Sequence, residues 1–140
     1  MGTIQVEDWI IDVNEARTTL FYAERPFDQE LAVLNYVQVS SFTDFEVMQF
    51  LEQLGVDILK PCELNSLPIE GDMVMYSGCY YVYGEIVQGE LDNWDVVIGQ
   101  HCFSLTEGNS DMPEELVGQV VEISFEVVYP WMLEEPFETP

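Results

Sequence analysis

One histidine and three cysteines are the side chains best suited to nucleophilic catalysis. His101 and Cys102 are adjacent in a segment expected to be a strand, where neighbours point to opposite faces, so they cannot form a Cys–His dyad with each other. Cys62 or Cys79 would have to reach His101 instead. The sequence around these residues has no glycine-rich elbow or other local catalytic signature. We therefore interpret His101 as a packed or surface histidine and predict that the protein is not an enzyme.

Carboxylates are so frequent that their pairing carries little information. With 27 Asp and Glu residues, some pair will always lie at the separation of about 5 to 10 Å that glycoside hydrolysis uses. A calcium site is the better acid-based alternative, because oxygen ligands crowd one turn at Glu90, Asp92, Asn93 and Asp95. This turn lacks the full loop with its glycine and closing glutamate. Solvated acids are the preferred interpretation, and no metal is expected.

The sequence lacks the loops and most of the basic residues that bind anionic cofactors. The sequence contains no Gly-x-Gly-x-x-Gly or Walker-type loop that would cradle phosphates. Its basic residues are Arg17, Arg25 and Lys60, which leave few donors for an anionic substrate or cofactor. We expect no cofactor.

The charge balance is the strongest signal in the sequence. The formal net charge is −24, and no basic residue follows Lys60. Nucleic acids and anionic membranes are bound by Lys and Arg clusters, so neither is an expected partner. The alternative is that the acidity serves solubility or halophilic adaptation, but a net charge of about 2 to 8 suffices for the solubility of a small domain. The excess predicts a basic protein partner.

Length and composition predict one soluble domain. A chain of 140 residues with 48% hydrophobic residues is long and apolar enough to bury one core. We place a single α+β domain at residues 1–130 and an acidic tail at 131–140. The start of the chain lacks the positive charge of a secretory signal, and no apolar run reaches the roughly 18 residues of a membrane span. Together with three cysteines expected to be reduced thiols, this predicts a cytoplasmic protein.

The α+β class is predicted from helical periodicity early in the chain and strand periodicity late. A helix at 43–54 has an apolar stripe, with Ser41 or Thr43 as its cap and Gly55 at its end. The other expected elements are a helix at about 5–16, although 17–22 could equally begin a strand, a buried strand at 31–39, and strands at about 79–87, 94–104 and 118–129. These strands should form a mainly antiparallel sheet with one or two helices packed on it. We expect burial of Phe50, Leu51, Leu54, Val121, Ile123 and Phe125.

Alternation along two of these strands suggests a binding surface. Val121, Ile123 and Phe125 would face the core, leaving Glu122 and Glu126 outward. On the strand that begins at Tyr80, the outward set is Tyr81, Tyr83 and Glu85. Tyrosine among carboxylates suits a cationic partner, because its ring can receive an arginine. The predicted site is therefore Tyr81, Tyr83, Glu85, Glu122 and Glu126, unless a helix covers this face and makes the tyrosines part of the core.

The function that follows is inhibition by nucleic-acid mimicry. Same-face residues on a strand recur about every 6.7 Å, close to the spacing of phosphates on an extended nucleic-acid strand. The expected partner is a basic protein, namely a nuclease or other nucleic-acid-binding protein. A phage or plasmid anti-CRISPR or anti-restriction protein fits, and so does an immunity protein that neutralises a nuclease toxin. The rival class is a small enzyme or calcium-binding domain.

Overall fold

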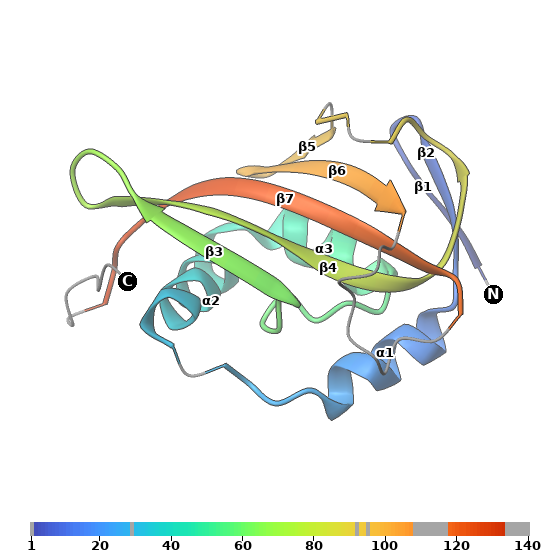
Figure 1. Cartoon of the computed structure of the whole chain (residues 1–140), viewed down its shortest axis with the longest axis horizontal. Coiled ribbons are helices and arrows are strands. Elements are labelled where there is room, and N and C mark those ends of the chain that lie inside the picture. The colour runs from blue at the N-terminus through green and yellow to red at the C-terminus, as the bar shows by residue number, and fades with distance from the viewer. Residues whose placement is uncertain (1, 29, 92, 95, 108–117, 134–140) are drawn as a thin grey trace.

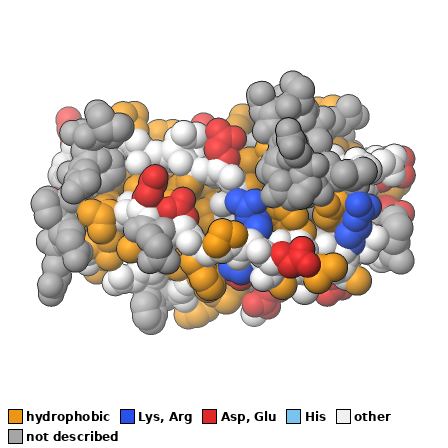
Figure 2. Space-filling model, turned by 60° about the horizontal axis from the view of Figure 1, so that its bottom comes forward, with side chains coloured by type: hydrophobic (Ala, Val, Ile, Leu, Met, Phe, Trp, Pro, Cys, Tyr) orange, Lys and Arg blue, Asp and Glu red, His pale blue; other side chains and the backbone are white. Residues whose placement is uncertain are grey.

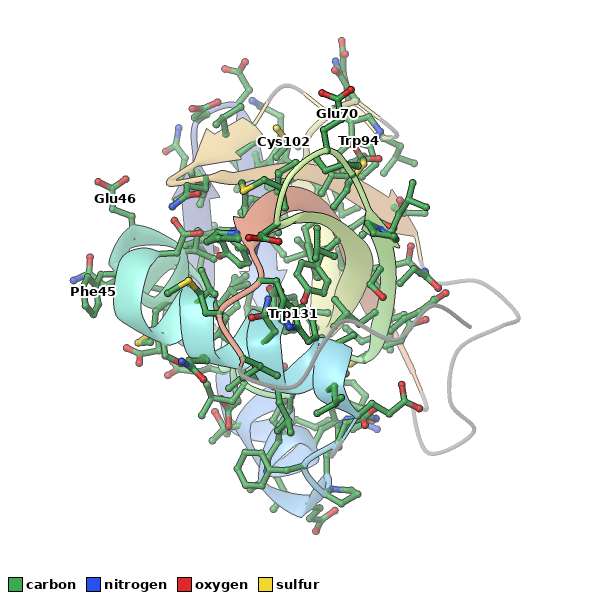
Figure 3. All side chains as sticks on the ribbon, turned by 90° about the vertical axis from the view of Figure 1, so that its left-hand side faces the viewer. Phe45, Glu46, Glu70, Trp94, Cys102 and Trp131 are labelled. Atoms are coloured by element: carbon green, nitrogen blue, oxygen red, sulfur yellow. The ribbon has the colours of Figure 1, made fainter. Side chains whose placement is uncertain are left out.

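An antiparallel sheet with helices against one face forms the body of the protein (Figures 1 and 3). The computed structural model describes residues 2–28, 30–91, 93–94, 96–107 and 118–133. Its strands are β1 (Gly2–Val6), β2 (Trp9–Val13), β3 (Glu63–Pro68), β4 (Met73–Gln88), β5 (Val96–Ile98), β6 (His101–Glu107) and β7 (Val120–Pro130). Its helices are α1 (Glu15–Glu24), α2 (Leu31–Thr43) and α3 (Phe45–Gln53). The predicted α+β class is confirmed.

The long strand β4 organises the sheet. The strand order is β1-β2-β4-β7-β6-β5, and β3 also pairs with β4. Along one edge of β4, β3 pairs with residues 74–79 and β2 with residues 84–88, so these two strands lie at opposite ends of it (Figure 1). The other edge pairs with β7 over eleven residues. A short stretch of β4 is therefore left without a strand partner on its first edge.

Side chains of helix α1 form hydrogen bonds with the backbone of that stretch, in place of a neighbouring strand. The Tyr22 hydroxyl donates to the main-chain oxygen of Tyr81 at 2.7 Å. The N–H of Tyr83 donates to the Thr18 hydroxyl oxygen at 3.0 Å. An unpaired buried backbone group costs about as much as a lost hydrogen bond, so these contacts fix α1 in register with the sheet.

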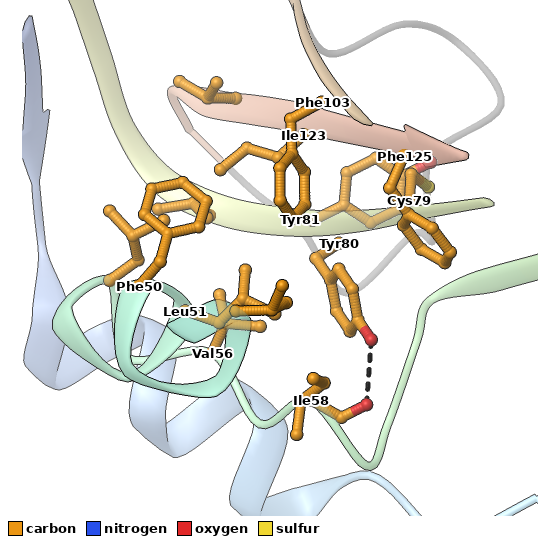
Figure 4. Close-up of a cluster of buried hydrophobic side chains, with 14 of the residues drawn as sticks. Phe50, Leu51, Val56, Ile58, Cys79, Tyr80, Tyr81, Phe103, Ile123 and Phe125 are labelled. Carbon is orange, nitrogen blue, oxygen red and sulfur yellow. Dashed lines mark hydrogen bonds between the residues drawn. The ribbon is translucent and has the colours of Figure 1, made fainter. Parts of the chain in front are cut away.

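The main core lies between the sheet and the pair α2–α3. Tyr36 on α2 stacks on Phe125 at a centroid distance of 5.4 Å, and Phe50 on α3 meets Phe103 at 5.3 Å. Figure 4 shows α3 side chains facing β4, β6 and β7 across this layer. All six residues expected in the core are buried, namely Phe50, Leu51, Leu54, Val121, Ile123 and Phe125.

The predicted strands of the second half are confirmed with changed bounds. The strand at 79–87 begins earlier, at Met73, and the strand at 118–129 corresponds to β7. The strand at 94–104 is two strands, because the turn Gly99–Gln100 reverses the chain between β5 and β6. Gly99 has φ +56°, which glycine adopts without strain. Strand β3 falls in a stretch for which no strand was predicted.

The first forty residues were predicted wrongly. Residues 5–13 are not helical, because β1 and β2 form a hairpin in which Trp9, Ile11 and Val13 are buried in alternation, and the helix begins only at Glu15. The segment 17–22, the alternative strand, lies inside α1. Residues 31–39, predicted as a strand, are the first part of α2. When an apolar run lacks a clear period of 2 or 3.6 residues, its pattern does not show whether it is a strand or a helix.

Helix α3 confirms the prediction at 43–54 except at its start. Its C-cap residue Leu54 is followed by Gly55 at φ +83°, as expected for a left-handed helix end. Neither Ser41 nor Thr43 is its cap, because α2 continues through Thr43 and Asp44 lies between the two helices. The side chain of Asp44 caps neither helix and points to the sheet instead.

The start of the predicted acidic tail contacts the domain. Trp131 packs against the core, and the N–H of Met132 donates to Asn35 Oδ1 at 2.7 Å. Residues 134–140 lie outside the described part of the chain, so the boundary at residue 130 stays a prediction.

Candidate functional site

The sheet face opposite α2 and α3, called the outer face here, carries the predicted site. Residues that pair across neighbouring strands share a face. The register therefore brings together Glu63 and Asn65 of β3, Ser77, Cys79, Tyr81 and Tyr83 of β4, Glu122, Ser124 and Glu126 of β7, and Cys102, Ser104 and Thr106 of β6. The same register also places Leu67, Met75, Val97 and Val128 on this face. The outer face is therefore a mixture of polar and apolar side chains, whereas the opposite face is aromatic and aliphatic.

Three of the five predicted site residues are accessible. Glu85 and Glu126 are exposed, and Glu122 is half-buried. Tyr81 and Tyr83 are only 4% and 6% exposed, so the expectation that both point into solvent is wrong. For Tyr83 the physical reason is that α1 lies along the edge of β4 and places Arg17 and Phe21 against its ring.

Each tyrosine has a partner within the domain. The Arg17 guanidinium lies 4.0 Å from the centroid of the Tyr83 ring, and the Phe21 ring lies 6.2 Å from it at a steep angle. Tyr81 hydrogen-bonds with Cys79, and burial together with the nearby Cys79 raises the pKa of its phenol. Tyr83 therefore receives an arginine on its ring, as the sequence suggested, but from its own chain.

Three outer-face glutamates, Glu63, Glu122 and Glu126, lie at widely spaced backbone positions. Glu122 and Glu126 are four residues apart on β7, which corresponds to about 13 Å at about 3.3 Å per residue. Glu63 faces Cys79, which faces Ser124 between the two glutamates. Strand spacing then places Glu63 about 12 Å from each of them. In the described part of the chain no Lys or Arg forms an ion pair with these three carboxylates.

A second acidic pair lies where β2 meets β4. Asp12 is directly opposite Glu85, an arrangement of like charges that disfavours folding. Sequence reasoning missed Asp12 and Glu63 as members of this face. Only the strand register could have shown them, because neither belongs to a strand that had been predicted.

The described residues most like a catalytic group form a buried chain of hydrogen bonds. His101 Nδ1 lies 3.1 Å from Asp44 Oδ2, and His101 Nε2 lies 2.9 Å from the Tyr36 hydroxyl. Tyr36 meets the Tyr80 hydroxyl at 2.7 Å, and Tyr80 donates to the main-chain oxygen of Ile58 at 2.8 Å, the bond drawn in Figure 4. Carboxylate, imidazole and hydroxyl thus follow one another in the order of a catalytic triad.

Burial and hydrogen bonding together shift the pKa values of the two ionisable groups, Asp44 and His101, in this chain of hydrogen bonds. Burial alone would raise the pKa of Asp44, but hydrogen bonds from His101, Tyr129 and the N–H of Gln100 outweigh it and hold that pKa below its ordinary value. Burial lowers the pKa of His101, although Asp44 opposes the shift. An ionised carboxylate only accepts hydrogen bonds, so the proton between the two belongs to Nδ1.

The side chains of this chain of hydrogen bonds are closed off from solvent. His101, Tyr36 and Tyr80 are fully buried, and Asp44 is 2% exposed. His101 is therefore a packed histidine, one of the two interpretations offered above. Cys102 lies on the outer face, as expected for its strand neighbour. The arrangement stabilises the contact between α2, α3 and the sheet.

The cysteines and the acidic turn show no metal site within the described residues. Cys62, Cys79 and Cys102 form no disulfide within the described residues. Burial is the main cause that raises the pKa of Cys79, and the Glu122 carboxylate adds to it. Asn93 donates to Glu90 Oε2 at 2.7 Å, whereas Asp92 and Asp95 lie outside the described residues. The part of the chain that is described has no group of three His, Cys, Asp or Glu side chains able to hold a metal.

Comparisons with known proteins add no assignment. Protein-family models, curated proteins and solved structures gave no match to this chain. None of the helices described here is long and apolar enough to cross a membrane.

Proposed function

We propose that this protein is a non-catalytic inhibitor that binds a basic, nucleic-acid-handling protein through its outer face, where carboxylates stand in for phosphates. The observation that supports it best is the spacing of Glu63, Glu122 and Glu126 on a sheet face that neither α2 nor α3 covers. The separation of about 13 Å between Glu122 and Glu126 is two same-face steps of about 6.7 Å along the strand, and each step is close to the spacing of phosphates on an extended nucleic-acid strand. Glu85 and Asp12 extend the same face.

Electrostatics supports recognition by this face. Among the side chains whose burial the structure describes, all carboxylates except Asp44 are exposed or half-buried, so the net charge of −24 acts on the surroundings of the protein. Oppositely charged surfaces raise association rates by roughly tenfold to a thousandfold. A partner with a cationic groove for nucleic acid would be captured quickly and would present the guanidinium and ammonium groups that carboxylates bind.

The two predicted tyrosines have a different role in this proposal. Because Tyr81 and Tyr83 are buried, they support the strand that carries Glu85 and do not contact the partner. The protein is either an anti-CRISPR or anti-restriction protein or an immunity protein. In both cases the outer face would bind the cationic groove of the partner.

The test compares two matched triple variants after affinity capture of the partner from the host cell. The first carries Glu63→Gln, Glu122→Gln and Glu126→Gln on the outer face. The control carries Glu24→Gln, Glu46→Gln and Glu52→Gln on α1 and α3, which are also exposed. Both variants lose the same number of charges, so they differ only in where the charge is lost.

We expect the outer-face variant to bind the captured partner at least about tenfold more weakly, equivalent to about 1.4 kcal/mol. The control should stay within about twofold of the original protein. Duplex DNA should displace the protein from its partner, because both would occupy the same groove. Equal loss in the two variants, or simultaneous binding of DNA and this protein, would show that the proposal is wrong.

A further inference from the structure

Two of the chain's three cations line one cleft beside the C-terminal end of α1. The cleft has a volume of about 290 Å³, and its lining includes Arg25, Phe27, Val33, Lys60 and Leu64. Figure 2 shows Lys and Arg side chains against hydrophobic ones on this face of the molecule, with carboxylates around them. In a protein of net charge −24, the placement of two of the three cations in one cleft calls for an explanation.

Arg25 and Lys60 both contact the last turn of α1. The main-chain N–H of Arg25 and the Lys60 ammonium donate to the main-chain oxygen of Tyr22, at 3.2 and 2.8 Å, and the Arg25 guanidinium carbon lies 5.3 Å from the centroid of the Phe21 ring. This oxygen belongs to the last turn of α1, where positive charge is favoured by the helix dipole. Lys60 Nζ also lies 4.6 Å from the centroid of the Phe27 ring. The position of the ammonium is therefore fixed from two sides.

Both cations keep unused hydrogen-bonding capacity. Arg25 Nε is buried and has no hydrogen-bond partner among the described residues, a state that costs free energy because the donor is left unsatisfied. Lys60 has three donors and uses one of them on Tyr22. Asp28, Glu30 and Glu63 also line the cleft, yet within the described residues none of them forms an ion pair with either cation. The cleft offers donors that the protein itself does not satisfy.

We propose that this cleft binds a small organic oxyanion, either a carboxylate or a phosphate monoester, that carries an apolar ring. The oxyanion accepts hydrogen bonds from Arg25 and Lys60, and the ring packs against Phe27, Val33 and Leu64. The volume corresponds to the lower end of the range for ligand pockets, about 300 Å³, so the ligand is of fragment size. The carboxylates on the rim exclude larger polyanions. This site does not rest on the proposed function.

The test is an NMR titration of the labelled full chain with phenyl phosphate, with benzoate, and with benzyl alcohol as the uncharged probe. We expect saturable amide shifts at Arg25, Phe27, Lys60 and Cys62 with at least one anion, with a Kd of about 1 mM or lower. The stronger of the two anions identifies the headgroup. Benzyl alcohol should bind at least about tenfold more weakly, because it forms no charge-assisted hydrogen bond.

The matched variants are Arg25→Gln and Arg17→Gln, which remove the same charge. Arg25→Gln should weaken binding at least about tenfold, and Arg17→Gln, outside the cleft, should change it by less than about twofold. Lys60→Gln also removes a contact at the end of α1, so Arg25→Gln, checked by its melting temperature, carries the test. Equal binding of benzyl alcohol, equal loss in both variants, or no saturation by about 10 mM of either anion would overturn the proposal.

Discussion

Replacing Asp44 by Asn tests whether the buried hydrogen-bond chain stabilises the fold. The substitution keeps the shape of the side chain and removes its charge. It leaves one oxygen for three donors, namely the N–H of Gln100, the imidazole of His101 and the hydroxyl of Tyr129. The new amide group can only donate, so it repels whichever donor it faces.

The magnitude follows from which donors water can reach. Gln100 is exposed, so its N–H can bond to water, whereas His101 and Tyr129 are fully buried. A buried group left without a partner costs about 1 to 3 kcal/mol, and breaking a buried charged pair costs about 3 to 5 kcal/mol. Since Asn retains one acceptor, we expect a loss near the lower end, about 3 kcal/mol of unfolding free energy.

Urea denaturation at neutral pH measures this loss. With a slope of about 2 kcal/mol per M, the midpoint should fall by about 1.5 M while the slope stays unchanged. Glu46→Gln is the matched control, because Figure 3 shows Glu46 pointing away from the molecule at the start of α3. It should change stability by less than about 0.5 kcal/mol. A loss below about 1 kcal/mol for Asp44→Asn would refute the reasoning.

The pH dependence gives an independent check on the same residue. The folded protein holds the pKa of Asp44 below its ordinary value, so its contribution is fully present above the pKa of an unfolded aspartate, about 3.9. The stability difference between the original protein and Asp44→Asn should therefore shrink as the pH falls below that value. Comparing the two proteins cancels the charge repulsion they share. A difference that grows on acidification would contradict the assignment.

Three further outcomes are expected. Tyr83→Ala should lower stability by about 3 kcal/mol, because it removes the ring that packs on Arg17 and Phe21, and should leave partner affinity unchanged at temperatures where the variant is folded; calorimetry and binding assays separate the two effects. Gly99→Ala should cost at least about 1 kcal/mol in a thermal melt, because Gly99 has a positive φ and an added Cβ would collide with Asp44. Association with the captured partner should slow by about tenfold or more as salt rises from about 50 to 500 mM, and a rate indifferent to salt would leave solubility as the role of the charge.

The sequence by itself predicted the elements whose polarity matches their burial. In β7, buried residues such as Ile123 and Phe125 alternate with Glu122 and Glu126, so period and face agree. Helix α3 behaves in the same way, since its apolar stripe is the stripe that packs on the sheet. The α+β class follows from such elements, because each must bury one apolar face.

Helix α2 was mispredicted because burial and polarity disagree along it. Asn35 and Ser40 are fully buried, whereas Leu34 is 36% exposed. Asn35 donates to the Tyr76 hydroxyl and accepts from the N–H of Met132, partners that lie far away in sequence. A polar residue is stable in a core only when such partners exist, and no local pattern reveals them. The helical period was therefore hidden.

For the candidate site too, the sequence determined some properties and the tertiary structure determined others. Composition alone determined that the surface is acidic, since 27 carboxylates cannot all be buried. Tertiary structure decided that Tyr81 and Tyr83 are buried by contacts with α1 and within the sheet. It also decided that Glu63 joins Glu122 and Glu126 on one face, because the register depends on the pairings of Glu63 with Cys79 and of Cys79 with Ser124, 16 and 45 positions apart, which the sequence pattern of a single strand does not contain.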